Sequence, residues 1–458
     1  MLCRNDLQIG GKKMVHGELV KRSDNIEWEY TTKAVTSWGG MRLMKELIDK
    51  TGILTRLKEL SIPYPHSNRG CSPLEIIESF WVCVWIGGIR FSHTAIIRFD
   101  KVLKEIFRWK KSPSVSTYTR FFNKFNREMA DGVFAELNKW FFAQVPIRKF
   151  TLDLDSTVCT RYGEQEGSVK GYNPHKKGRN AHHPIIAFLA DIRMVANAWL
   201  RPGNTSSANN VRAFFEETLR ILEAKRIGLI RADSGFFDGK FLGLIESLVL
   251  KYVIAVKMNA LLKNFVLNHN SWLSIDAGID IGEFMYKAGC WKQERRIIVI
   301  RQSVIKRPRS FGKMLFKELP EYRSYKYQLY ITNLDLAGAE VWRLYRQRAD
   351  SENRIKELKY EFGMNGFCLH KFYATEAAFR MVLVAYNLLS LFRQGILKQQ
   401  VQQTLSTIRF KCFALGGWIA KSGRKKVLKL SVAIQRRVWL DGLFGKLADF
   451  SAPFPIKT

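Results

Sequence analysis

Three acidic residues, far apart in the chain, occupy positions from which they could bind hard metal ions together. Asp155 and Asp233 each end a short run with strand character, and Glu352 lies on a later helical segment. Strand ends in α/β sheets hold side chains rigidly at one edge, where sites form. Carboxylate oxygens suit Mg²⁺ or Mn²⁺, and two such ions can activate an attacking oxygen and stabilise a leaving oxygen. These residues therefore predict two-metal phosphodiester chemistry.

Each aspartate also has an ordinary interpretation. Asp233 lies in RADSGF, a segment rich in turn formers, where an aspartate often caps a helix or closes a turn. In FTLDLDST the apolar residues alternate with Thr151, Asp153 and Asp155, which predicts a strand with both acids on one face. Asp153 is therefore either the true ligand or a neighbour that makes the local potential more negative.

The third carboxylate belongs to a polar stripe. We expect one long helix from near Gly338 to about Glu361. Counted from Tyr345, the residues Arg348, Glu352 and Lys359 are 3, 7 and 14 positions further along the chain. At 100° per residue, the four side chains point in directions within about 60° of each other around the helix axis. This stripe borders an apolar side, where polar groups need a partner or a function. The alternative, an Arg348–Glu352 pair at i,i+4, leaves Tyr345 and Lys359 unexplained.

A basic tract, GYNPHKKGRNAHHP, lies between two predicted strands. We interpret it as a loop that contacts phosphates, although a solvated basic turn has the same composition. Its candidate contacts are Lys170, His175, Lys176, Lys177 and Arg179.

Two sets of residues have weaker functional interpretations. His182 and His183 lack the HExxH or cysteine partners of a zinc site, so packing or DNA contact is the expected role. Four aromatic residues are candidates for stacking on an unpaired base, with core packing as the alternative. They are Trp291, Trp342, Phe236 and Phe237.

Composition narrows the class of protein. The 458 residues include 74 Lys plus Arg against 41 Asp plus Glu, a formal charge of +33. So basic a chain needs an acidic partner, most often nucleic acid. A cationic ribosomal or surface protein is the alternative, but the length and the 47% hydrophobic content count against a ribosomal protein. Seven cysteines without a CxxC motif predict reduced thiols in the cytosol.

No segment has the features of a secretory or membrane protein. The N-terminus is polar, which does not suit a signal peptide. The longest uncharged apolar runs, Ser79–Ile89 and Met381–Phe392, are shorter than the roughly 20 residues of a membrane span, so we expect core helices there.

The order of predicted elements suggests an α/β fold. From Lys149 the elements follow the order β-β-β-α-β-α-β, which matches a ribonuclease-H-like catalytic core. We expect this core to contain a β-rich insertion and to be flanked by helical N- and C-terminal regions. The predicted regions are 1–148, helical and DNA-binding; 149–259, the first part of the core; 260–338, the insertion; 339–373, the Glu-bearing helix; and 374–458, helical and basic.

Two basic segments lie in the flanking regions. In the first, a serine precedes the helical run YTRFFNKF, which is either a recognition helix or a plain capped helix of a bundle. In the second, a basic tract contains Lys421, Arg424, Lys425, Lys426 and Lys429.

The stripe has the spacing Y-x2-R-x3-E-x6-K, and it follows LDLDST, GYNPHKKGRNAHHP and RADSGF in that order. Together these motifs resemble insertion-sequence DDE transposases, most of all the insertion-sequence thirteen-eighty group, over roughly residues 75–395. The resemblance implies metal-dependent cleavage at transposon ends and strand transfer into target DNA. It makes Asp155, Asp233 and Glu352 the catalytic residues, with Tyr345, Arg348 and Lys359 holding DNA phosphates.

The resemblance also implies partners and a location. The partners would be double-stranded DNA with terminal inverted repeats, target DNA and a second copy of the chain in a homodimer on DNA. The location would be the bacterial cytoplasm, in association with the nucleoid. Two alternatives are a structure-specific nuclease on the same fold and a non-catalytic transposase-derived DNA-binding protein. The latter predicts loss of an acidic residue or of the stripe, and all of them are present.

Overall fold

A mixed sheet is the central element of the computed structural model, which describes residues 28–65, 69–174, 176–223, 225–304, 325–398 and 401–456. The sheet has nine strands in the order β6-β5-β1-β7-β8-β12-β11-β10-β9. Strands β1, β7 and β8 are parallel, and the other neighbours are antiparallel. The predicted α/β class is confirmed.

Five strands form the part of the sheet that bears the aspartates. Their bounds are β1 Lys149–Ser156, β5 Ile185–Leu189, β6 Met194–Trp199, β7 Arg226–Ala232 and β8 Tyr252–Ala255. On β1, Phe150, Leu152 and Leu154 are buried in the apolar core. Asp153 and Asp155 alternate with them, as predicted.

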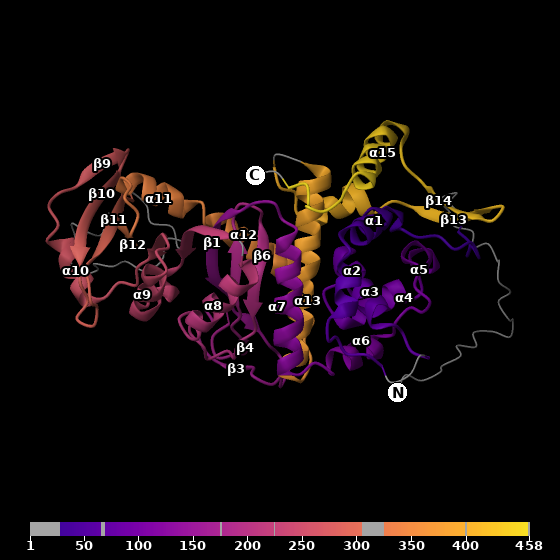
Figure 1. Cartoon of the computed structure of the whole chain (residues 1–458), viewed down its shortest axis with the longest axis horizontal. Coiled ribbons are helices and arrows are strands. Elements are labelled where there is room, and N and C mark those ends of the chain that lie inside the picture. Colours follow the sequence, from indigo (N-terminus) through magenta and orange to yellow (C-terminus); the bar gives the residue numbers. More distant parts are fainter. Residues whose placement is uncertain are drawn as a thin grey trace.

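The predicted β-rich segment continues this same sheet. Strand β12 (Tyr325–Thr332) pairs with β8 through Tyr330 and Ala255, and β11 (Arg295–Ser303), β10 (Ile279–Tyr286) and β9 (Leu273–Asp276) follow outward. Figure 1 shows these strands at the left of the molecule, with α10 (Ala260–Leu267) and α11 (Gly338–Arg346) beside them.

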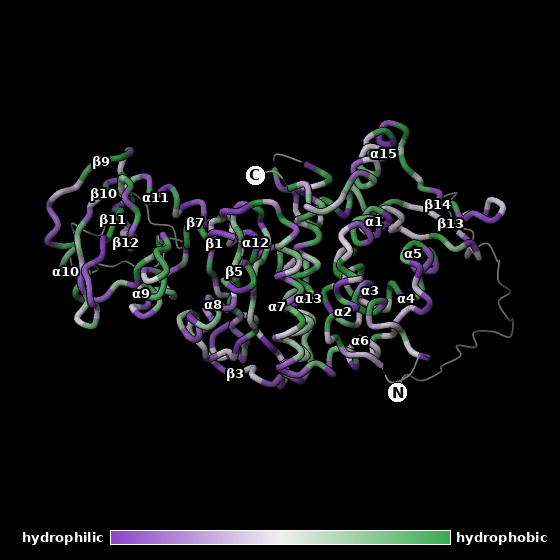
Figure 2. Tube along the Cα trace, viewed as in Figure 1, coloured by the Kyte–Doolittle hydropathy of each residue, from purple (hydrophilic) through white to green (hydrophobic). Residues whose placement is uncertain are grey.

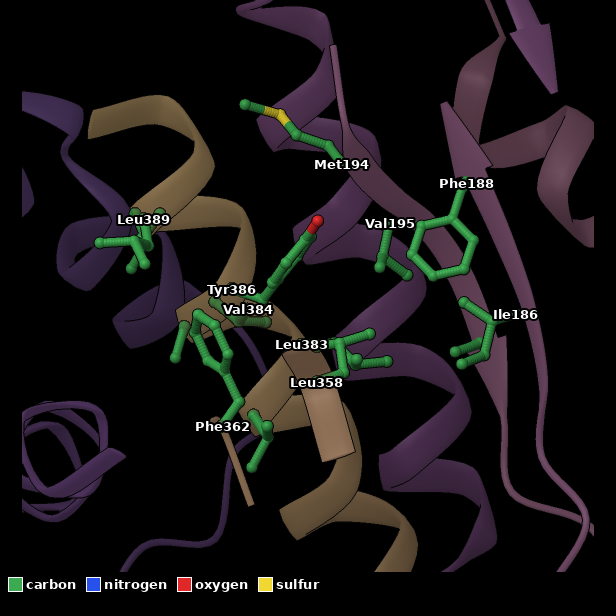
Figure 3. Packing of buried hydrophobic residues seen from close by; sticks show 14 of the residues in the cluster. Ile186, Phe188, Met194, Val195, Leu358, Phe362, Leu383, Val384, Tyr386 and Leu389 are labelled. Carbon is green, nitrogen blue, oxygen red and sulfur yellow. The ribbon is translucent and has the colours of Figure 1, made fainter. Parts of the chain in front are cut away.

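Helices cover the core strands. Helix α8 (Val211–Leu222) connects β6 to β7, and α9 (Gly239–Ser247) connects β7 to β8. Helices α7 (Arg127–Ala143) and α13 (Phe372–Leu391) pack against β6. In Figure 3, Leu383 and Val384 of α13 lie near Val195 of β6, and Leu358 approaches from the Glu-bearing segment. The apolar face of β5 and β6 is thereby buried.

The described residues of the N-terminal region form mainly helices. Its other helices are α1 Arg42–Thr51, α2 Ile53–Glu59, α3 Pro73–Trp85, α4 Thr94–Arg98, α5 Lys101–Phe107 and α6 Val115–Phe122. The core helix expected at Ser79–Ile89 corresponds to α3, which begins at a Ser72–Glu75 capping box. Its Trp81 and Trp85 indoles donate to carbonyls of α13, to Met381 at 3.2 Å and to Ala385 at 3.1 Å.

One helical run of the N-terminal region is interrupted. The run Thr94–Phe107 is divided between α4 and α5, because the Asp100 carboxylate caps α5 by accepting from the Leu103 N–H at 2.8 Å. The predicted serine cap is Ser114, which accepts from the Thr117 N–H of α6 at 3.3 Å.

The C-terminal region corrects the prediction of an all-helical segment. It contains α14 (Leu405–Ile408) and α15 (Ile434–Ala448), but the basic tract forms a hairpin of β13 (Gly417–Ser422) and β14 (Lys425–Leu430). Gly423 makes the turn between the two strands at φ +59°.

Helix α13 and its extension, Phe372–Leu397, form the one helical stretch in the described part of the chain that is long and apolar enough to cross a membrane. Its apolar window is entirely buried inside the protein, as expected of a core helix. Figure 2 shows hydrophobic residues along α13 and hydrophilic ones at the tip of the β13–β14 hairpin. The cysteines in the described ranges are unpaired.

Candidate active site

The two aspartates lie at the ends of adjacent parallel strands. Leu154 of β1 is in register with Ala232 of β7, so Asp155 and Asp233 follow at the same edge of the sheet. Asp155 is buried, with 6% of its surface exposed, and its Oδ1 accepts from the Ser156 N–H at 2.8 Å. The Asp233 carboxylate accepts from the Gly235 N–H at 2.9 Å, so the turn that Asp233 closes also orients its side chain.

Glu352 lies in the first turn of helix α12 (Ala349–Tyr360) and is exposed. Burial is the largest cause that raises the pKa of the Asp155 carboxyl, to about 6, and the charges of Asp233 and Glu352 raise it further. Three carboxylates from separate elements therefore share one electrostatic environment. Convergence of all three carboxyl groups in one metal site stays a prediction.

Arg348 partly neutralises the negative charge at Asp155. Its Nη2 lies 2.7 Å from Asp155 Oδ2 and donates to the Leu154 carbonyl at 3.3 Å. Burial would lower the pKa of Arg348, but the Asp155 carboxylate reverses the effect and holds that pKa above its usual value. The predicted alternative, an ion pair with Glu352, does not form within the described part of the chain.

The Glu-bearing segment is two helices, which corrects the prediction of one continuous helix. Helix α11 ends at Arg346 and α12 begins at Ala349. At the junction the Arg348 N–H donates to the Tyr345 carbonyl at 2.9 Å and not to the Leu344 carbonyl four residues back. The freed Leu344 carbonyl accepts from Arg231 Nη1 at 2.7 Å, which satisfies it and stabilises the break.

Arg231 also decides the role of Asp153. Its Nε and Nη2 lie 2.6 Å and 2.9 Å from the two oxygens of Asp153, and both residues are almost fully buried. Both Asp153 oxygens are thus occupied, which leaves Asp155 as the acid of β1 that interacts with Asp233. Sequence reasoning missed Arg231, although an arginine inside the apolar strand GLIRA already requires a buried partner.

Tyr345 and Lys359, the other members of the stripe, both contact the protein. The Tyr345 ring lies 4.5 Å from that of Tyr330, and burial, followed by the acidic groups, raises the pKa of its hydroxyl to about 12. Lys359 Nζ donates to the Val158 carbonyl at 3.1 Å, just beyond β1. Phosphate binding by Tyr345, Arg348 and Lys359 stays a prediction.

The donor set fits a hard divalent cation. No group of three or more His, Cys, Asp or Glu side chains lies close enough to hold a metal in the ranges that the structure describes. Carboxylate oxygens nevertheless suit such an ion, because a bound cation offsets the repulsion between neighbouring carboxylates. Arg348 provides a single positive charge there, beside an Asp155 carboxyl whose pKa stays raised.

Comparison with known proteins identifies the family. The profile described as "Transposase DDE domain group 1" matches residues 19–451. The chain belongs to this family. No curated protein matches it. Among solved structures, the cryo-EM structure of a piggyBac transposase synaptic complex with hairpin DNA is 12% identical, covers 83% of this chain and 81% of that one, and superposes with a TM-score of 0.43.

The basic tract of the transposase runs from the end of strand β3 (Val169–Lys170) through a connecting loop into strand β4 (Asn180–His182), which pairs with β3. Lys170, Lys176, Lys177 and Arg179 are exposed, and His175 lies outside the described residues. Lys176 Nζ lies 4.9 Å from the ring centre of Tyr162, and the Asn173 side chain accepts from the Lys176 N–H at 2.9 Å. The loop therefore presents its cations outward, and phosphate contact stays a prediction.

Two of the four proposed stacking residues belong to the core. Phe236 is fully buried and Trp342 is 8% exposed. Phe237 and Trp291 are partly exposed and pack edge to face with ring centres 5.8 Å apart. The Arg295 guanidinium lies 4.4 Å from the Trp291 ring, and both Phe237 and Trp291 pack against the main core. Stacking of either residue on a base stays a prediction.

A cavity of about 350 Å³ lies toward the other end of β1. Thr151, Arg193, Arg231 and Arg354 are among its lining residues, and the three candidate catalytic carboxylates are not. The candidate catalytic carboxylates therefore lie outside this cavity.

The histidine pair has a structural role, as expected. His182 is fully buried, accepts from Arg161 Nε at 2.9 Å and contacts the Glu166 carbonyl at 3.0 Å through Nε2. His183 is 7% exposed and contacts the Thr205 carbonyl at 2.6 Å. Burial, and then Arg161, lower the pKa of His182 to about 4, so it is neutral in the folded protein.

We expect His182 to make the transposase sensitive to acid. The His182 imidazole takes up a proton near pH 6.5 in the unfolded chain but only near pH 4 in the folded protein. Its contribution to the free energy of unfolding is therefore fully present above pH 6.5 and is lost as the pH falls from 6.5 to about 4. The loss from this group is roughly 3 kcal/mol. Denaturant midpoints measured at several pH values should therefore fall more steeply in wild type than in His182→Gln, whose amide can keep both hydrogen bonds. Equal slopes would contradict this origin.

Proposed function

We propose that this transposase cleaves DNA at transposon ends and joins the ends to target DNA, using two Mg²⁺ or Mn²⁺ ions. Asp155, Asp233 and Glu352 are the proposed ligands and catalytic residues. The observation that carries the proposal is the register of β1 and β7, which brings Asp155 and Asp233 to adjacent strand ends. Burial, and then the charges of Asp233 and Glu352, raise the pKa of Asp155 to about 6. The order β6-β5-β1-β7-β8 supports a ribonuclease-H-like core around them.

The chain's own residues prepare this site. When bound, the metal ions supply activation of the attacking oxygen and stabilisation of the leaving oxygen. Arg348 favours the ionised form of Asp155 and fixes the direction of its Oδ2. The Gly235 N–H orients Asp233, and Lys359 holds the chain at Val158, just after β1. Tyr345, whose pKa is about 12, keeps its proton and can donate a hydrogen bond to a phosphate.

The proposed partners are two DNA duplexes and a second copy of the chain. The tract with Lys170, His175, Lys176, Lys177 and Arg179 would hold the backbone of the cut end. The Y-R-E-K spacing supports membership of the insertion-sequence thirteen-eighty group, and hence terminal inverted repeats, a homodimer on DNA and a bacterial, nucleoid-associated location.

The test uses purified protein and a duplex with the terminal repeats that flank its gene. We expect cleavage with Mg²⁺ or Mn²⁺, reduction to background with EDTA, and recovery when metal is restored. Cleaved ends should also become joined to a supercoiled plasmid. Cleavage without joining would favour the nuclease, and end binding without cleavage would favour the non-catalytic protein. Full cleavage in EDTA would contradict the metal mechanism.

A further inference from the structure

The β13–β14 hairpin is strongly basic and projects from the C-terminal region, at the end of the molecule opposite the β-rich segment (Figure 1). Residues 417–430 contain five cations, Lys421, Arg424, Lys425, Lys426 and Lys429, and no acidic residue. All five side chains are exposed. The functional site described above uses none of them.

The register of the hairpin places like charges together. Lys421 is directly opposite Lys426, next to the turn at Gly423. Like charges that face each other across a strand pair are destabilising unless something neutralises them. Lys426 has an intramolecular partner, Glu105 of α5, at 2.5 Å. Within the part of the chain that the structure describes, the other four have no ion-pair partner.

The base of the hairpin is held against the protein. Ile419, Leu428 and Leu430 pack on the main core. Thr36 and Gly417 exchange two backbone hydrogen bonds of 2.9 Å, and Lys33 Nζ lies 3.9 Å from the Trp418 ring centre. The hairpin is therefore fixed to the protein at its base and carries its exposed positive charges around the turn. We call it the arm.

We propose that this hairpin is a DNA-binding arm that contacts the phosphates of a double-stranded segment away from the catalytic carboxylates. The proposal rests on the proposed function, because it takes DNA as the substrate. A two-stranded ribbon fits the major groove of B-DNA, and cations at the turn and along both strands would meet phosphates on either side. From Lys421 to Lys425 no side chain is apolar, unlike a segment that inserts into a lipid surface.

The test compares full-length wild type with the triple variant Lys421→Ala, Lys425→Ala, Lys429→Ala. Binding of a fluorescent duplex of arbitrary sequence is measured by anisotropy over a range of salt concentrations. For each phosphate contact, the logarithm of the binding constant falls by about 0.9 per tenfold increase in salt concentration. Loss of three contacts should therefore make the slope of this salt dependence shallower by about 2.7. Affinity at physiological salt should fall on the order of tenfold or more.

Two control variants test whether the effect depends on positive charge in the hairpin and not on the total positive charge of the protein. The triple variant Lys58→Ala, Lys240→Ala, Lys287→Ala removes three exposed lysines that lie outside the hairpin, and its salt slope should stay near that of wild type. Lys→Arg at the three hairpin positions should keep both slope and affinity. Because the replaced hairpin lysines are exposed, the melting temperature of every variant should match wild type.

The outcomes distinguish the two proposals. If wild type binds the duplex and the hairpin variant has the same salt dependence as wild type, the hairpin does not bind DNA, and the proposed function is unaffected. If wild type does not bind DNA at all, both fail. If the same three lysines instead govern binding to phosphatidylserine vesicles and not to the duplex, the arm binds lipid and the proposal is overturned.

Discussion

Replacing Glu352 with Gln should abolish DNA cleavage while end binding persists. Gln keeps the shape of the side chain and removes the charge that would hold a hard cation. Glu352 is exposed and has no ion-pair partner among the described residues, so the fold should not depend on it. We expect the cleavage rate to fall at least about a hundredfold. Loss of a residue that only supports a metal ligand costs about 10–100-fold, and loss of a ligand itself should cost more.

Glu340→Gln is the matched control, since this exposed glutamate lies on the preceding helix α11. It should cleave as wild type does. Both variants are assayed for end binding, cleavage in Mg²⁺ and melting temperature. A Glu352→Gln protein that cleaves at near the wild-type rate would remove Glu352 from the site.

Replacing Arg231 with Met should cause the largest loss of stability. The change leaves the fully buried Asp153 carboxylate without its cation and the Leu344 carbonyl without its donor. Loss of one partner of a buried ion pair costs about 3–5 kcal/mol, because the remaining charge stays uncompensated. The measurement is the free energy of unfolding from the first cooperative transition in denaturant.

A double variant tests the cause. Asp153→Val with Arg231→Met removes both charges and should recover most of the loss, since an apolar pair can replace a buried ion pair. Arg42→Met is the control for a surface pair: Arg42 lies 2.7 Å from Glu46 in a half-exposed helix pair, and its loss should cost about 0.3–0.5 kcal/mol. If Arg231→Met costs no more than Arg42→Met, the buried pair does not stabilise this fold.

Local patterns in the sequence were sufficient for several elements. The alternation in FTLDLDST predicted β1, because a strand exposes successive side chains to opposite faces. The apolar run Ser79–Ile89 predicted a buried helix, and α3 covers most of it. The charge of +33 and the spacing of the carboxylates pointed to phosphodiester chemistry on nucleic acid, consistent with the family match over residues 19–451.

Some predictions failed because longer-range contacts outweighed local preference. The segment from Gly338 to Glu361 has a helical pattern throughout, yet it is broken at Gln347 and Arg348. Arg231, more than a hundred residues earlier in the chain, binds the carbonyl that a continuous helix would have used. The basic C-terminal tract became a hairpin because its apolar residues pack on the core as a strand pair.

By itself, the sequence determined which side chains are available, which of them share a strand face or a helix stripe, and how much positive charge the protein carries. The tertiary structure decided the pairing: Arg231 with Asp153, 78 residues apart, and Arg348 with Asp155 and not with Glu352. These choices depend on the order of strands in the sheet and on which guanidinium is buried beside which carboxylate. Periodicity reports only the direction of a side chain relative to its own element, whereas the cost of burying an unpaired charge is set by the neighbours that folding places around it.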